Sequence, residues 1–139
     1  MAFLWIANAL ALVFGAGLGA RALFDPKWAS RFVRLRPDEQ AGGFAEFRAT
    51  YGGVFFAMHV AALVLTLRYL LAGGYLVGVV ATGAAAVLAA GWAGSSGGRA
   101  LAILLDGVDT KFNRQSAAVE AAMALAIAAP WIGWYFARA

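Results

Sequence analysis

The sequence contains no cysteine, only three prolines, a single histidine and few charged side chains. Without cysteine the chain can form no disulfide, carry out no thiol redox chemistry and offer no thiolate ligand to a metal. It also lacks the Gly-x-Ser-x-Gly motif of hydrolases, a two-histidine metal motif and a phosphate-binding glycine loop. We therefore expect no metal and no cofactor. An enzyme is disfavoured, although a carboxylate and a histidine can suffice for isomerase chemistry.

Apolar residues dominate instead, at 63% of 139 residues, with only 13% charged. A soluble domain of this size could not bury so much apolar surface. Four apolar runs, near 3–24, 44–71, 73–94 and 116–136, each approach or exceed the ~20 residues needed to cross ~30 Å of hydrocarbon. The first has no basic n-region and is long for a signal peptide, so we expect a retained helix. The sequence predicts an all-α fold, a four-helix transmembrane bundle forming one integral membrane domain over residues 1–139.

A short amphipathic helix is expected between the first two spans. Asp25 is suited to cap it, Pro26 to occupy its first position, and Pro37 to end it before a polar turn over 37–43. One side is apolar and the other mostly basic, which is typical of a helix lying at the membrane interface (Trp28, Phe32 and Leu35 against Lys27, Arg31 and Arg34). It is either a docking site for anionic lipid or a partner, or a basic connector anchored by Trp28, the commoner case.

Glycine and serine punctuate the second half of the chain. The segment 94–98 predicts a break or kink in the third helix, after which residues 99–105 either lie at the interface or continue that helix. Ser116 is expected to cap the fourth helix and Pro130 to kink it near its end. In the first helix, Ala11, Gly15 and Gly19 follow the four-residue spacing that lets helix backbones approach closely.

Basic residues are distributed unevenly between the two sides of the predicted bundle. If four helices span, the connections after the first and third helices collect nine of the eleven basic residues, leaving Arg68 and Arg138 on the other side. The positive-inside rule then predicts that both termini are periplasmic, which also accounts for the basic composition without a nucleic-acid partner. Aromatic belts agree, with an inner pair (Trp28 and Trp92) and an outer group (Trp5, Tyr69, Tyr75, Trp131, Trp134 and Tyr135).

Ionisable residues gather at the inner end of the predicted bundle: Glu46, Arg48, Arg99, Asp106 and Glu120. Glu46 and Arg48 are two residues apart on a helix and cannot face each other, so Arg99 and Asp106 are the expected partners. The set is either a polar pocket for a headgroup, substrate or proton, or a structural clamp between the third connection and the second helix. Charges close to the interface favour the clamp.

The polar residues Arg48, His59 and Thr66 of the second span lie in one stripe of the helix. The same stripe also contains Gly52, Phe55 and Ala62. His59 has no second haem ligand in the chain and no neighbour suited to a proton relay. A neutral histidine bonded to a neighbouring helix is the commoner role for such a residue. The alternative hypothesis is a cavity along this stripe, with Arg48 at its mouth and His59 at its floor.

The motif Glu46-x-Arg48-x-x-Tyr51-Gly52-Gly53, followed by Gly98-Arg99 and Asp106-Gly107, resembles the DoxX-like group of membrane proteins. It is most similar to a branch of small bacterial four-helix proteins classed as a domain of unknown function. The resemblance implies a four-helix bundle in the bacterial inner membrane and little about activity. Relatives include a subunit associated with thiosulfate–quinone oxidation, a methylamine-utilisation protein and eukaryotic assembly chaperones. Thiol chemistry cannot carry over, because the chain has no cysteine.

Two functions remain open. The first is a non-catalytic membrane module: a subunit, an assembly factor, or a binder of a hydrophobic ligand such as a lipid or quinone in a bundle cavity. The alternative is a small transporter working as a homo-oligomer. Small transporters that insert in both orientations need a nearly balanced basic count, so the biased count favours the first. The candidate site residues, for a ligand or for a structural ion cluster, are Glu46, Arg48, Tyr51, His59, Arg99 and Asp106.

Overall fold

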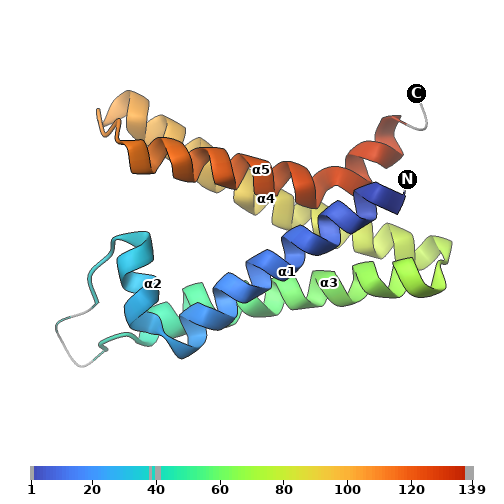
Figure 1. Ribbon diagram of the computed structural model, residues 1–139, viewed down its shortest axis with the longest axis horizontal. Coiled ribbons are helices and arrows are strands. Elements are labelled where there is room, and N and C mark those ends of the chain that lie inside the picture. The colour runs from blue at the N-terminus through green and yellow to red at the C-terminus, as the bar shows by residue number, and fades with distance from the viewer. Residues whose placement is uncertain (1, 38, 40–41, 137–139) are drawn as a thin grey trace. The chain divides into compact units, whose positions relative to one another are not determined.

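The structure is a computed structural model that describes residues 2–37, 39 and 42–136. All regular secondary structure in these residues is helical (Figure 1), which confirms the predicted all-α fold. The elements are α1 (Ala2–Phe24), α2 (Pro26–Val33), the π-helix η1 (Phe47–Val54), α3 (Phe55–Ala72), α4 (Tyr75–Leu105) and α5 (Lys111–Phe136). Arg138 and part of the polar turn expected over 37–43 lie outside the described residues.

Four helical segments are long and apolar enough to cross a membrane: α1, η1 continued by α3, α4, and α5. They overlap the four predicted spans, and the chain is a multi-pass membrane protein by this criterion. At 1.5 Å per residue the 31 residues of α4 extend about 46 Å, well beyond ~30 Å of hydrocarbon. One end of α4 therefore reaches past the apolar layer.

Two predicted helix boundaries are wrong. Helix α4 runs without interruption through residues 94–98 and includes 99–105, because glycine and serine keep their backbone hydrogen bonds within a long apolar helix. Helix α5 begins at Lys111, so Ser116 is not its cap. Thr110 caps it instead, its Oγ1 accepting a hydrogen bond from the backbone N–H of Asn113 at 3.1 Å.

The chain divides into two compact units. The central unit is Leu12–Val64, and the split unit combines Met1–Ala11 with Leu65–Ala139. Residues of α1 and of α3 therefore belong to both units. The two units are described separately below.

In the central unit, α2 forms as its sequence predicts. The Asp25 side chain accepts a hydrogen bond from the Trp28 backbone N–H at 3.0 Å, and Pro26 occupies the first turn. The helix ends at Val33, four residues before the predicted end at Pro37, because Arg34 adopts a left-handed conformation with φ of 60°.

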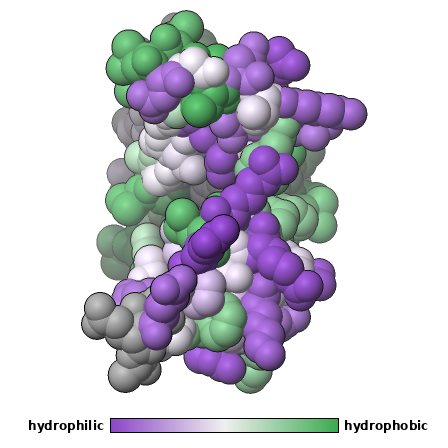
Figure 2. All heavy atoms as spheres, turned by 90° about the vertical axis from the view of Figure 1, so that its left-hand side faces the viewer, coloured by the Kyte–Doolittle hydropathy of each residue, from purple (hydrophilic) through white to green (hydrophobic). Residues whose placement is uncertain are grey.

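The apolar side of α2 faces a small core in the same unit. Ala22, Ala29 and Phe47 are buried together, with Trp28 among the side chains that pack around them. The basic side chains of α2 are exposed instead. Figure 2 shows hydrophilic side chains on the face that lies at the left of Figure 1, where α2 is found. Of the three apolar residues on the predicted packed side, Trp28 contacts this core, whereas Phe32 and Leu35 are about half exposed.

In the central unit, α1 approaches α3 and η1 closely at glycine residues. A Cβ added to Gly19 of α1 would lie 2.5 Å from the backbone nitrogen of Phe56 in α3, and one on Gly15 would lie 2.1 Å from Cδ2 of His59. A Cβ added to Gly52 of η1 would likewise lie 2.7 Å from the Cα of Leu23 in α1. The four-residue spacing in α1 thus marks a close helix crossing, as its small residues predicted.

In the split unit, α4 and α5 lie side by side (Figure 1). Their buried residues are mostly small, including Ala81, Ala85 and Ala89 of α4 and Ala124 of α5. Beyond this apolar part, the Ser96 hydroxyl donates a hydrogen bond to the Ala117 carbonyl at 2.9 Å. The last turns of α5 change direction in Figure 1, as expected of a helix that contains Pro130.

A buried polar network joins three helices of the split unit. The Asn8 side-chain amide in α1 donates a hydrogen bond to the Ile127 carbonyl in α5 at 2.7 Å, and its oxygen accepts one from the Thr66 hydroxyl in α3 at 2.8 Å. Asn8 and Thr66 are fully buried. Ile127 precedes Pro130 by three residues, where a proline bend weakens the intrahelical hydrogen bonds and leaves a carbonyl free for another donor.

Replacing Asn8 by leucine is expected to destabilise the protein by about 1–2 kcal/mol, because two interhelical hydrogen bonds are lost and the Thr66 hydroxyl is left unpaired. Thermal unfolding in detergent measures the effect. The matched control is Leu10→Ala, since Leu10 is 66% exposed on the same helix. An Asn8→Leu protein as stable as the parent would show that the network contributes nothing.

Candidate functional site: an aromatic cavity

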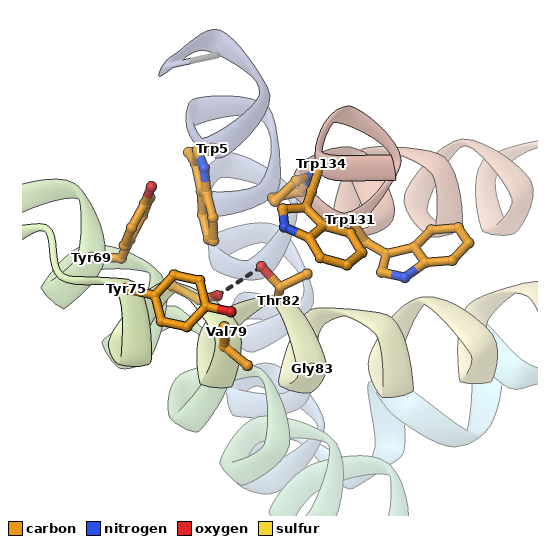
Figure 3. A pocket seen from close by; sticks show the side chains of 10 residues that line it. Trp5, Tyr69, Tyr75, Val79, Thr82, Gly83, Trp131 and Trp134 are labelled. Carbon is orange, nitrogen blue, oxygen red and sulfur yellow. Dashed lines mark hydrogen bonds between the residues drawn. The ribbon is translucent and has the colours of Figure 1, made fainter. Parts of the chain in front are cut away.

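One end of the split unit contains a cavity of about 640 Å³ (Figure 3). Its walls come from four helices that are widely separated in sequence. They consist of Trp5 from α1, Tyr69 from α3, Tyr75, Gly78, Val79, Thr82 and Gly83 from α4, and Pro130, Trp131 and Trp134 from α5. Every one of these residues belongs to the split unit, so the cavity is complete within it.

A tight turn positions the two tyrosines. Gly73 and Gly74 have φ angles of 69° and 95°, which glycine adopts without strain, and they reverse the chain between α3 and α4. Tyr69 packs over Gly78, where a Cβ would lie 2.8 Å from its ring. Its ring also meets that of Trp5, with centroids 4.3 Å apart. This contact forms the wall on the left of Figure 3.

The opposite wall is built by the end of α5. Pro130 is buried, whereas Trp131 and Trp134 remain nearly half exposed along the rim. Between the two walls, the position of Gly83 is open, because a Cβ added there would meet nothing within 4 Å. The cavity is open on this side because glycine has no side chain to fill it.

The lining is strongly selective in residue type. It takes three of the five tryptophans and two of the four tyrosines but none of the ten phenylalanines. None of the described residues that line it is charged. Tryptophan and tyrosine combine an apolar ring with a polar N–H or O–H group, a combination suited to the membrane interface. Such a site can hold an uncharged molecule with an apolar body and a few polar atoms.

The predicted ion cluster is paired differently from our expectation. The Nε of Arg99 in α4 donates to both carboxylate oxygens of Glu120 in α5, at 2.8 and 2.9 Å. Glu120 is buried, with 10% of its side chain exposed, and Arg99 is more accessible at 30%. Arg99 lies about 36 Å along α4 from Tyr75, beyond the length of the hydrocarbon layer. This pair joins α4 to α5 at the end of the split unit away from the cavity.

Asp106 does not join that pair. It follows the last turn of α4 and is exposed, its backbone N–H donating to the Ala102 carbonyl. Among the residues that the structure describes, no ion pair involving Asp106 is seen. The other ion pair of this region is Arg114 with Asp109 at 3.1 Å, and both of its members are largely exposed.

Glu46, Arg48 and Tyr51 all lie in the central unit. Arg48 donates a hydrogen bond from Nη1 to the Leu23 carbonyl at 2.6 Å, satisfying a backbone acceptor in the last turn of α1. Glu46 is exposed. Tyr51 stacks on Phe47 with ring centroids 5.6 Å apart. The π-helix that holds these residues was not predicted, since its sequence has the pattern of an ordinary helix.

The His59 side chain fills the place where a cavity along the stripe of the second span was expected. The imidazole is fully buried, packs against Gly15 and hydrogen-bonds through Nδ1 to the Phe55 carbonyl at 2.7 Å. The floor of the proposed cavity along this stripe is therefore filled, and that hypothesis is wrong at His59. The alternative was a neutral histidine bonded to a neighbouring helix. The ring does pack against Gly15 of that neighbour, α1, but the hydrogen bond from Nδ1 to Phe55 stays within α3.

Two features of the split unit escaped the sequence analysis. Asn8 is a lone amide in an apolar helix, and that isolation was the available signal of a buried hydrogen bond. The cavity residues had been assigned to an aromatic belt, which described their depth but not the space between them. Within the described residues, no group of three or more metal-ligating side chains comes together.

Comparison of the chain with models of known families, with curated proteins and with solved structures finds no match. The DoxX-like resemblance therefore continues to rest on the motifs alone.

Proposed function

We propose that this protein is a small, non-catalytic membrane module that binds an uncharged hydrophobic ligand, a lipid or quinone, in the aromatic cavity. As a subunit or assembly factor it would present that ligand, or respond to it, within a membrane complex. The four apolar helices support the membrane location. The motif around Glu46 and Arg48 supports a place among the DoxX-like proteins of the bacterial inner membrane.

The observation that carries this proposal is the cavity itself. Its volume of about 640 Å³ falls within the roughly 300–1,000 Å³ typical of small-molecule sites. Ligand sites are commonly apolar with a few polar groups that orient the ligand, and this lining has that composition. The transporter alternative gains less support, because the buried acid Glu120 is already paired with Arg99 and no acid lines the cavity.

Filling the cavity tests the proposal. Gly83→Leu is expected to abolish retention of the co-purifying ligand without lowering the melting temperature, because the new side chain enters open space and leucine favours the helix by up to about 1 kcal/mol. Native mass spectrometry from nanodiscs, or from mild detergent, reads the retained mass.

The matched control for this test is Gly91→Leu. Gly91 is also in α4 with nothing within 4 Å of its Cβ position, and it lies outside the cavity lining. That variant should retain the ligand. Equal retention by both variants, or no retained ligand in the parent protein, would contradict the proposed function.

The orientation is part of the proposal. The turn between α3 and α4 contains no basic residue, whereas basic side chains gather in the connection from α1 to η1 and in the first turn of α5 (Lys27, Arg31, Arg34 and Arg36, and Lys111 and Arg114). We therefore expect both termini to be periplasmic. Alkaline phosphatase fused to the C-terminus should be active and green fluorescent protein at the same site dark. The reverse pair of signals would overturn the orientation and place the aromatic cavity at the cytoplasmic side.

A further inference from the structure

The chemistry of the cavity narrows the class of ligand. Resting on the function proposed above, we infer that the site recognises carbonyl oxygens carried on an uncharged apolar body.

Among the polar side chains that line the cavity, more can donate a hydrogen bond than can only accept one. Tryptophan offers an N–H and no acceptor, and both Trp5 and Trp131 line the cavity. Among the described residues, no acceptor for either indole N–H is seen. Trp131 is 46% exposed, so its N–H is not sealed in the interior. Trp5 is buried, and no buried side-chain nitrogen or oxygen among the described residues lacks a partner, so its N–H also reaches open space. Each can therefore donate to a molecule in the cavity.

The hydroxyl groups add further donors. Tyr69 and Tyr75 come from the two sides of the α3–α4 turn, and each phenol can donate or accept. The Thr82 hydroxyl is already committed as a donor to the Gly78 carbonyl at 2.7 Å (Figure 3). Donors therefore prevail along the walls, and the complementary group on a ligand is an acceptor.

Charge restricts that acceptor further. Among the residues that the structure describes, no lysine, arginine, aspartate or glutamate lines the cavity, so a phosphate or carboxylate would lose its hydration without gaining a counter-ion from them. An uncharged acceptor carries a much smaller desolvation cost and is satisfied by N–H and O–H donors. The carbonyl group meets both requirements, and flat aromatic walls suit a flat carbonyl-bearing group.

Two kinds of membrane molecule carry such carbonyls: the ring of a quinone and the ester groups of a glycerolipid. Each has a close analogue that lacks the carbonyl groups. Reducing decylubiquinone to decylubiquinol replaces ring carbonyls by hydroxyls, and an uncharged dialkylglycerol replaces the ester carbonyls of a diacylglycerol by methylene groups. The two pairs separate the two sources of the same chemistry.

The experiment offers each pair in equal amounts to the protein in nanodiscs and measures retained ligand by native mass spectrometry, under anaerobic conditions for the quinone pair. We expect the carbonyl-bearing member of one pair to be enriched about five- to tenfold, the equivalent of about one net hydrogen bond. Enrichment of decylubiquinone identifies a quinone site, and enrichment of the ester lipid identifies a lipid site.

Variants of residues that line the cavity test whether these side chains cause the preference for the carbonyl-bearing ligand. Tyr75→Phe and Trp131→Phe remove a donor while keeping an aromatic ring, and each should reduce the enrichment at least twofold without changing the melting temperature. Tyr135→Phe is the control, because Tyr135 stacks on Trp131 from outside the lining.

The outcomes separate this inference from the function on which it rests. Retention of both members of each pair without preference, lost in Gly83→Leu, would overturn carbonyl recognition and leave the proposed function standing. Preference for a charged probe, dodecyltrimethylammonium, over both carbonyl-bearing ligands would also overturn it. Failure to retain any of these molecules would overturn the inference and the function together.

Discussion

Gly19→Ala is expected to destabilise the protein by about 3 kcal/mol, at the upper end of the usual cost of overpacking. The added Cβ would lie 2.5 Å from the backbone nitrogen of Phe56 and 2.7 Å from its Cα. A side chain could rotate away from such a contact, whereas here two helix backbones must separate. The separation would also loosen the packing of His59 against Gly15, one turn away in the same helix crossing.

Gly17→Ala provides the control for Gly19→Ala. Gly17 is two residues away in α1 and a Cβ there meets nothing within 4 Å, so only the gain in helix propensity applies. This variant should be neutral or stabilised by up to about 1 kcal/mol. Unfolding in mild detergent, followed by circular dichroism, compares the two. If both alanine variants match the parent, the close crossing of α1 and α3 is wrong.

Arg99→Met is expected to have the second largest effect. It leaves the buried carboxylate of Glu120 without the two contacts made by Nε, at 2.8 and 2.9 Å. Removing one partner of a fully buried ion pair costs about 3–5 kcal/mol, and the partial exposure of Arg99 reduces this to about 2–3 kcal/mol. The melting temperature should fall accordingly.

Two further variants test the cause of that loss. Arg99→Met combined with Glu120→Leu should recover most of the stability, since no charge then remains buried. Arg114→Met disrupts only the exposed pair with Asp109 and should cost less than about 1 kcal/mol. A double variant as unstable as Arg99→Met alone would show that the loss comes from packing and not from a stranded charge.

The predictions from sequence succeeded where neighbouring residues determine the outcome. Asp25 and Pro26 begin α2 because a side-chain cap and a fixed φ act within one turn. They failed at 94–98, where glycine and serine suggested a break. Helix α4 continues through them beside α5, and the Ser96 hydroxyl donates a hydrogen bond to the Ala117 carbonyl of that helix.

Pairings between distant residues were harder to predict. Arg99 was expected to meet Glu46 and pairs with Glu120, which is one of several acids that the same reasoning had placed near the inner membrane surface. Topology assigns a charge to a side of the membrane, but it does not specify which helices face each other. That choice depends on the contact of α4 with α5, which small residues along both helices make close.

By itself, the sequence determined that the chain is helical, that it contains four segments able to span a membrane, and that a short amphipathic helix follows the first. Hydrophobicity, length and capping are properties of contiguous residues and can be read without a structure. Only the tertiary structure decided that His59 fills its stripe and that five aromatic rings surround a cavity. Both depend on whether side chains from different helices meet or leave space. The absence of a Cβ at Gly15 makes room for the His59 ring, and its absence at Gly83 leaves the cavity open.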